Sequence, residues 1–545
     1  MAAEASDRVY VLHFAQSHTD FRLAELAASA EFMGVTYELL PTPSREDPVG
    51  RVGDVSRPFL LCRMADDEAA RRLLQRCSAL RGVWELWACA DTYTELHARN
   101  QAARRFEPWL APAYSWKALM QGFNVALSEA RRLALIQSFS YMAFQGPVRM
   151  RHSDVTWGVL EEYRRATHGT EVEARGHAEL GDRHPRLVQL FLGRKIKDRS
   201  GVPPARDLIE ALSLKKRRYI GNTSMESEMS VIMATMALAG PGQLIYDPFA
   251  GTGSMLYACS MLGAYTMGSD IDGRMLRGKD ALGVPGVRLS AAQYSLEGRL
   301  LDTAVFDMTQ SPWRAPFRQG AGLFDAIVTD RTWYLLTHIA PYGVRAGAKR
   351  LGRRNVADQR DEPFIMADGT PAHMRPDYLP PTKPYHLSEL IDDLLAYASA
   401  LLRPGGRLVF WLPTMNEDDV ETAIPSHPHF DLVAHSLQDF GRWGRRLITL
   451  QKRYDAPSAP MPSAKARPAP PGRILASDRP SEFRNRDLEK IIASSNAANR
   501  KMEEQISVGK GFDAISELWG QLSELMAQAG QPPAAEAPEE AGTTP

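Results

Sequence analysis

The chain has 545 residues, enough for two to four domains, and 44% of them are hydrophobic, enough for sizeable cores. Lys plus Arg equals Asp plus Glu at 65 each, so net charge gives no argument for nucleic acid and any basic face must be local. The four cysteines form no CxxC pair, which disfavours a disulfide framework or intrinsic metal site and favours the reducing cytoplasm. We expect neither a secretory signal nor a membrane span, because no apolar run reaches about 18 residues.

The first 195 residues show two similar strand and helix units. Segments 9–14 and 35–40 are β-rich and flank a helical apolar stripe between 21 and 32. A second unit has strand-like 58–62, a helix at 66–79 and strand-like 83–87. We therefore expect a compact α+β domain over 1–195, followed by a linker over 196–212.

An α/β domain is expected over residues 213–454. Thr223 to Glu226 has the spacing of a helix capping box, and the helix should continue to Leu238 with its methionines filling the core. Later strands are expected at 406–412 and 446–450.

Beyond residue 454 the composition changes. Residues 456–472 are rich in Pro, Ala and Ser and predict a flexible or extended linker, and 531–545 predicts disorder. Between them, 512–526 carries a one-sided apolar stripe. Docking of this stripe on a partner and docking on the chain's own domains both stay open.

A glycine-rich turn follows the apolar strand 244–246 and precedes a helix-like segment, 255–259. The turn, 247–254, reads Asp-Pro-Phe-Ala-Gly-Thr-Gly-Ser. Glycines allow a ligand to approach the backbone, and a helix N-terminus attracts an anionic group. The acid at the strand end suits a ligand that is also positively charged, which favours S-adenosylmethionine over a dinucleotide.

Further acids follow later strand-like runs, and in open α/β sheets ligands bind at the carboxyl ends of strands. Asp270 could accept hydrogen bonds from ribose hydroxyls, Asp307 could receive an adenine amino group, and Asp330 ends a fourth strand. Singly, each acid could equally be a cap or turn residue. We assign cofactor binding to Thr223, Asp247, Phe249, Gly251, Gly253, Asp270, Ile271 and Asp307.

Methylation of an exocyclic amine on a base requires the nitrogen lone pair to be localised. A carboxylate that accepts hydrogen bonds from the amine and an aromatic ring stacked on the base do this, and an Asp-Pro-Pro-Tyr loop supplies both. Here Asp330 is separated from Pro341-Tyr342-Gly343 by residues 331–340, which have the pattern of an extra strand. The acid and the Pro-Tyr of such a loop are thus both present, with ten residues between them, and we predict no metal ligand.

Basic residues cluster on both sides of these motifs. Phosphate contacts from such clusters position an RNA without reading its sequence, although solvated surface charge explains any one cluster almost as well. We predict RNA contacts from Lys215, Lys216, Arg217, Arg218, Arg345, Lys349 and Arg350, with a further basic run at Arg442, Arg445 and Arg446.

Several blocks resemble the catalytic subunits of eukaryotic tRNA guanine-10 N2-methyltransferases, a THUMP-domain family: 213–225, 247–254, 343–347, 382–385 and 441–447. The resemblance spans residues 8–453. It implies an α/β fold, in which a Rossmann-like seven-stranded methyltransferase domain follows an α+β region with a THUMP domain that grips tRNA. It also implies a small zinc-binding activator subunit as obligate partner, and the Asp-Pro-Pro-Tyr roles for Asp330, Pro341 and Tyr342.

Two alternatives stay open, and only the first of them depends on residues 331–340. The chain could be a tRNA-binding scaffold that has lost catalysis, or a DNA amino-methyltransferase, since adenine N6 and cytosine N4 pose the same chemical problem. The interruption itself could be an insertion that loops out or a retained intron. With Arg331 encoded as CGT and Ile339-Ala340 as ATA-GCN, removing the intervening bases restores Asp-Pro-Pro-Tyr-Gly.

Overall fold

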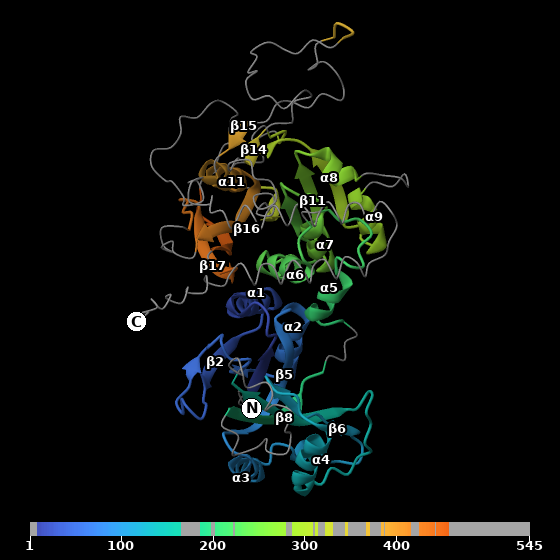
Figure 1. Ribbon diagram of the computed structural model, residues 1–545, viewed down its shortest axis with the longest axis vertical. Coiled ribbons are helices and arrows are strands. Elements are labelled where there is room, and N and C mark those ends of the chain that lie inside the picture. The colour runs from blue at the N-terminus through green and yellow to red at the C-terminus, as the bar shows by residue number, and fades with distance from the viewer. Residues whose placement is uncertain are drawn as a thin grey trace, which may run out of the picture.

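The computed structural model describes residues 8–164, 186–197, 202–221, 224–278, 286–308, 311–313, 322–330, 344–346, 367–370, 383–385, 387–415, 424–441 and 443–456. It has two sheet-based regions, one above the other in Figure 1. The interruption at 331–340 and the segments beyond 456 lie outside the described residues.

The N-terminal region is built on a nine-stranded mixed sheet of order β3-β2-β4-β1-β5-β9-β8-β6, with β7 also pairing with β8. Its core clusters place apolar side chains on both faces, against the helices on one of them. The strands are β1 (Arg8–Phe14), β2 (Tyr37–Thr42), β3 (Arg51–Val52), β4 (Phe59–Met64), β5 (Leu80–Ala90), β6 (Trp116–Ala118), β7 (Gln121–Phe123), β8 (Val155–Tyr163) and β9 (Leu187–Lys195). The helices are α1 (Arg22–Met33), α2 (Asp67–Arg76), α3 (Tyr93–Ala103) and α4 (Glu129–Ser138).

The C-terminal region is built on a seven-stranded sheet of order β12-β11-β10-β13-β16-β18-β17. The first five strands in this order are parallel, and β18 runs antiparallel to both of its neighbours. The strands are β10 (Leu244–Asp247), β11 (Tyr265–Asp270), β12 (Leu300–Val305), β13 (Phe324–Thr329), β16 (Leu402–Met415), β17 (Phe430–Asp439) and β18 (Trp443–Lys452). The predicted Rossmann-like seven-stranded fold is confirmed, although the sequence reasoning did not anticipate β17.

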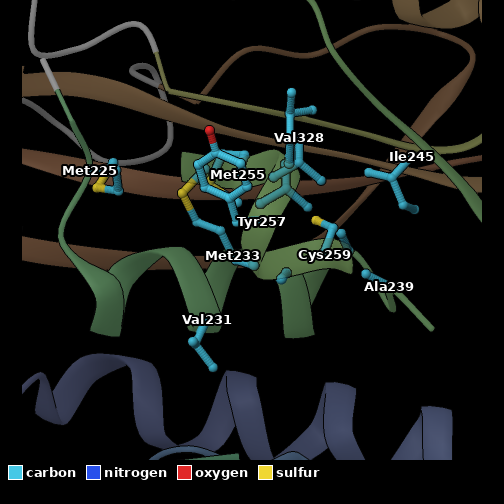
Figure 2. Packing of buried hydrophobic residues seen from close by; sticks show 14 of the residues in the cluster. Met225, Val231, Met233, Ala239, Ile245, Met255, Tyr257, Cys259 and Val328 are labelled. Carbon is cyan, nitrogen blue, oxygen red and sulfur yellow. The ribbon is translucent and has the colours of Figure 1, made fainter. Parts of the chain in front are cut away.

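Helices cover both faces of this sheet. On one face, α6 and α7 pack over Ala326, Val328 and Val409, and on the other α11 packs over Tyr246 and Phe410. Figure 2 shows the first of these cores, with Met233 of α6 and Met255 of α7 among its labelled residues. The helices are α5 (Ala205–Ala211), α6 (Ser227–Met236), α7 (Ser254–Met261), α8 (Gly273–Arg277), α9 (Gly286–Gln293) and α11 (Leu387–Leu401). The stretch expected as a linker over 196–212 therefore contains α5.

The two regions share one core. Phe21 and Ala28 of the N-terminal region belong to the same buried cluster as α6, and the Phe21 ring lies 5.9 Å from that of Trp411 on β16. Figure 2 shows Val231 of α6 pointing toward α1. Arg407 of β16 donates to the carbonyl of Met236 and, at 2.5 Å, to the carboxylate of Glu31 on α1. Apolar packing, a buried hydrogen bond of Arg407 and its ion pair with the half-exposed Glu31 thus join the two regions.

Two short motifs from separate parts of the sequence pair with each other. Strand β14 (Val344–Ala346) runs antiparallel to β15 (Lys383–Tyr385), with Arg345 opposite Pro384.

Among the described residues, no helix has the length and apolarity needed to cross a bilayer. In the same residues, no three His, Cys, Asp or Glu side chains gather as metal ligands.

Candidate methyltransferase site

The glycine-rich turn lies between β10 and α7, at the carboxyl edge of the sheet. Gly251 and Gly253 have φ values of 52° and 83°, in the left-handed region that favours glycine. A Cβ on Gly253 would lie 2.8 Å from the Tyr257 hydroxyl, so a side chain cannot be added without displacement. Gly253 is also the N-cap of α7 and provides no capping side chain. The turn therefore presents backbone N–H groups that suit an anionic group.

Asp247 ends β10 beside this turn and is 3% exposed. One of its oxygens accepts a hydrogen bond from the backbone N–H of Phe249 at 2.9 Å. Its pKa is raised to about 8, chiefly by burial and to a smaller degree by the neighbouring carboxylates of Asp270 and Asp330, against the lowering effect of that hydrogen bond. The acids at the ends of the neighbouring strands β11, β10 and β13 therefore lie close enough to interact.

Asp270, at the end of β11, uses both oxygens to hold the backbone. One accepts from the N–H of Gly251 at 2.9 Å and the other from the N–H of Asp272 at 2.8 Å. Each oxygen has a second lone pair, so these bonds are compatible with hydroxyl groups of a ligand. Asp270 thus fixes the glycine turn to the neighbouring strand.

The order of the strands explains why these acids meet. From β10 the chain moves outward to β11 and β12, then returns to the other side of β10 at β13. The carboxyl ends of β10 and β13 therefore flank a topological switch point, where ligands bind in open α/β sheets. Asp247 and Asp330 lie at these two ends.

The prediction that Arg217 contacts RNA is wrong for this structure, because the side chain is buried. Its guanidinium donates to the Ser254 hydroxyl and the Thr252 carbonyl, both at 2.8 Å, and lies 4.4 Å from the centre of the Tyr257 ring. Arg217 therefore stabilises the glycine turn through these hydrogen bonds. Lys215, Lys216 and Arg218 are exposed, and Lys216 forms an ion pair with Glu210.

The predicted capping box is also wrong. Helix α6 begins at Ser227 with Glu226 as N-cap and no side-chain capping bond. Ser224 instead accepts from the N–H of Gly221 at 2.9 Å, and its hydroxyl lies 2.7 Å from that of Thr252. The segment before α6 is thus tied to the glycine turn rather than to the helix, a role that the spacing of residues could not reveal.

The remaining predicted site residues fall into two groups. Phe249, Ile271 and Asp307 are described, partly buried, and follow the carboxyl ends of β10, β11 and β12. Arg345 lies on β14. Thr223, Pro341, Tyr342, Lys349 and Arg350 lie outside the described residues.

Arg445 is a feature of the site that sequence reasoning placed on the surface. It is 5% exposed, and its guanidinium lies 4.2 Å from the centre of a Trp411 ring. Its Nε donates to the side-chain oxygen of Gln438 at 2.7 Å. The alternation of side chains along β18 indicates this burial, since Leu447 and Ile448 face opposite cores and Arg445 lies two residues before Leu447.

Comparison with known proteins assigns the family. Residues 8–183 match the model described as the Tmrp11 THUMP N-terminal domain, and residues 485–526, outside the described residues, match one described as DASH complex subunit Dad1. The tRNA (guanine(10)-N(2))-methyltransferase of Schizosaccharomyces pombe is 35% identical, over 82% of this chain and 89% of that protein. The Saccharomyces cerevisiae and Homo sapiens proteins of that name are 33% and 30% identical, with 92% and 90% of their lengths covered.

A solved structure, that of TrmN from Thermus thermophilus, aligns with 82% of this chain and 99% of its own, at 16% identity and a TM-score of 0.36, too low for further argument. The identities and coverage of the sequence relatives are sufficient: the chain belongs to the tRNA (guanine(10)-N(2))-methyltransferase family.

Proposed function

We propose that this protein transfers a methyl group from S-adenosylmethionine to the N2 atom of a guanine in tRNA, by family guanine 10. The observation that carries the proposal is the gathering of Asp247, Asp270 and Asp330 at one end of the parallel sheet, beside the glycine turn. These residues supply what the cofactor needs: N–H groups for its carboxylate and acids for its ammonium and hydroxyls.

The residues that would hold the cofactor are those of the turn and the neighbouring strand ends. Glycine at 251 and 253 leaves space at the backbone, and Asp247 and Asp270 offer acceptors. When bound, S-adenosylmethionine supplies a methyl carbon made electrophilic by the adjacent sulfonium. Because the pKa of Asp247 is about 8 in the free protein, a cationic ligand that favours its charged form should displace a proton.

Asp330 is proposed to accept hydrogen bonds from the guanine amino group. This localises the nitrogen lone pair, which the purine ring otherwise delocalises. Pro341 and Tyr342 are proposed to complete the loop, with Tyr342 stacking on the base. A guanine in a stem must leave its stack to reach the site, at a cost of a few kcal/mol. The exposed Lys215, Lys216 and Arg218, with Arg345, Lys349 and Arg350, are proposed as phosphate contacts.

We retain two further proposals. The family resemblance implies a small zinc-binding activator subunit that forms a heterodimer with this chain, and the sequence pattern predicts division into regions 1–195, 196–212, 213–454 and 455–545. The four unpaired cysteines fit a reducing compartment such as the cytoplasm.

The test is nucleoside analysis of tRNA incubated with the chain, labelled cofactor and the activator. We expect labelled N2-methylguanosine in tRNA and none in DNA. Label in DNA adenine or cytosine would favour the DNA enzyme, and binding of cofactor and tRNA without turnover would favour the scaffold. Mass spectrometry of the mature protein addresses residues 331–340: a peptide containing Trp333-Tyr334-Leu335 would end the intron hypothesis.

A further inference from the structure

Three neighbouring strands of the catalytic sheet present side chains on the same face. Val328 of β13, Trp411 of β16 and Leu447 of β18 all belong to the core under α6. Since side chains alternate along a strand, Asp330, two residues after Val328, and Arg445, two residues before Leu447, lie on that face too. Thr329, the last residue of β13, is paired with Phe410, so continuing this register by one residue sets Asp330 beside the position of Trp411. The guanidinium of Arg445 lies on the ring of this same Trp411.

Arg445 is held in place from several sides. Its guanidinium stacks on Trp411 at 4.2 Å, its Nε donates to Gln438 on β17, and its terminal nitrogen lies 4.0 Å from the Met225 sulfur. Trp411 is itself fixed by a contact of its indole N–H with the Met233 sulfur at 3.1 Å. Figure 2 shows Met225 beyond the N-terminal end of α6.

A buried cation requires a negative partner. Burial lowers the pKa of Arg445, and the two carboxyl groups whose charges oppose that effect are Asp330 and Glu226, the N-cap of α6. Asp330 in turn is coupled to Asp247 of β10, which is coupled to Asp270 of β11. These interactions make Arg445 a buried cation that interacts with Asp330, while Arg217 supports the glycine turn.

We propose that Arg445 is a positioning residue for methyl transfer: from the face it shares with Asp330, its guanidinium keeps that carboxyl group charged and restricts its orientation. The inference rests on the proposed function of Asp330 and deepens it. Without this cation, Asp330 would lose an attraction that favours its charged form, and the carboxyl group of Asp247 would still lie close enough to interact with it. A protonated carboxyl loses acceptor capacity for the target amine.

The first experiment measures the pH dependence of kcat with tRNA, S-adenosylmethionine and the activator for Arg445→Gln, Arg445→Lys and Arg446→Lys. Arg446 is also buried but precedes Leu447 on the opposite face, so Arg446→Lys is the matched control. For Arg445→Gln we expect kcat at pH 7 to fall on the order of tenfold, with the KM for the cofactor little changed. The acidic limb should move upward by about one pH unit.

Arg445→Lys should restore most of the position of the acidic limb, because it keeps the charge, and Arg446→Lys should leave the limb where it is. A loss of kcat in Arg445→Gln that is equal at every pH would overturn the proposal and leave Arg445 a structural residue. Gln438→Met, which removes only the partner of Nε, should give a smaller shift in the same direction.

The second experiment does not depend on turnover. Melting temperatures of Asp330→Asn, Arg445→Gln and the double variant form a cycle that measures the interaction of the two side chains. We expect the double variant to melt above the temperature predicted by adding the single effects, by about 2 °C or more. Additive effects would overturn the proposal. Absence of methyl transfer by the wild-type protein would count against the proposed function, and the cycle would still decide whether Arg445 pairs with Asp330.

Discussion

The two halves of the catalytic sheet hold their acids differently. In the half formed by β10 and β11, Asp247 and Asp270 are held by backbone N–H groups of the turn that they support. In the half formed by β13, β16 and β18, the buried Arg445 lies on the ring of Trp411, and we propose it as the partner of Asp330. The proposed cofactor half is therefore set by backbone geometry, whereas the proposed target half would depend on a pair of charges.

The largest effect is expected in the target half. Asp330→Ala removes the acceptor for the guanine amine, so methyl transfer should fall by about 10³-fold or more. Because phosphate contacts supply most of the tRNA affinity, binding should change by less than about twofold. Labelled methyl incorporation and filter binding check the two quantities. Equal losses of both would show that Asp330 has a structural role.

In the cofactor half, Gly253→Ala tests the geometry of the turn. The new Cβ meets the Tyr257 hydroxyl at 2.8 Å and the residue has φ +83°, so we expect a loss of about 1–3 kcal/mol in stability and tenfold or more in cofactor affinity. Gly242→Ala is the control for φ alone, since Gly242 has φ +81° and nothing lies within 4 Å of its Cβ position. Titration calorimetry and urea unfolding measure both. A Gly253→Ala variant no worse than Gly242→Ala would contradict the steric argument.

The raised pKa of Asp247 predicts that the folded protein without cofactor loses stability as pH rises. Its pKa of about 8 lies above the ordinary 3.8, so between these values the folded protein binds more protons than the unfolded chain. The group's contribution to stability is therefore present at low pH and lost as pH rises toward 8, by up to about 1.4 kcal/mol per pH unit. Asp247→Asn should remove this slope and weaken cofactor binding. Urea unfolding at pH 5 to 8 measures it, and identical slopes in both proteins would refute the assignment.

The smallest effects separate two adjacent arginines. Arg217→Met should cost about 1–3 kcal/mol of stability, because the Thr252 carbonyl loses a buried donor, without altering the salt dependence of tRNA binding. Arg218→Met should leave stability unchanged and reduce the slope of log affinity against log salt by about one. Thermal melting and binding at several salt concentrations distinguish them. A change in the salt slope for Arg217→Met alone would restore it as an RNA contact.

The sequence predicted elements with strong apolar patterns, such as the helix α1 and the strands β1, β10, β13 and β18, because these patterns depend on local periodicity. It missed β17, whose residues Leu432 and Val433 are exposed and give no clear alternation around a register shift. It also predicted the acids at the strand ends, because each of them directly follows a short apolar run that is typical of a strand.

The sequence did not predict contacts between segments that are far apart along the chain. Arg217 and Arg445 both sit in basic runs that look like surface, and only tertiary packing buries them against Tyr257 and Trp411. The same is true of Ser224, whose partner Thr252 is far along the chain. A single sequence does not distinguish a buried arginine from its exposed neighbour.

The common core between α1, α6 and β16 has a consequence for how a substrate is engaged. Domains joined by polar, loosely packed surfaces swing relative to each other, but Phe21, Trp411 and the Arg407–Glu31 pair leave little freedom for such a hinge. An RNA that contacts both regions meets a body of constant shape. The distortion needed to extract a paired base then falls on the nucleic acid, and transcripts with weakened pairing near the target should be the easier substrates.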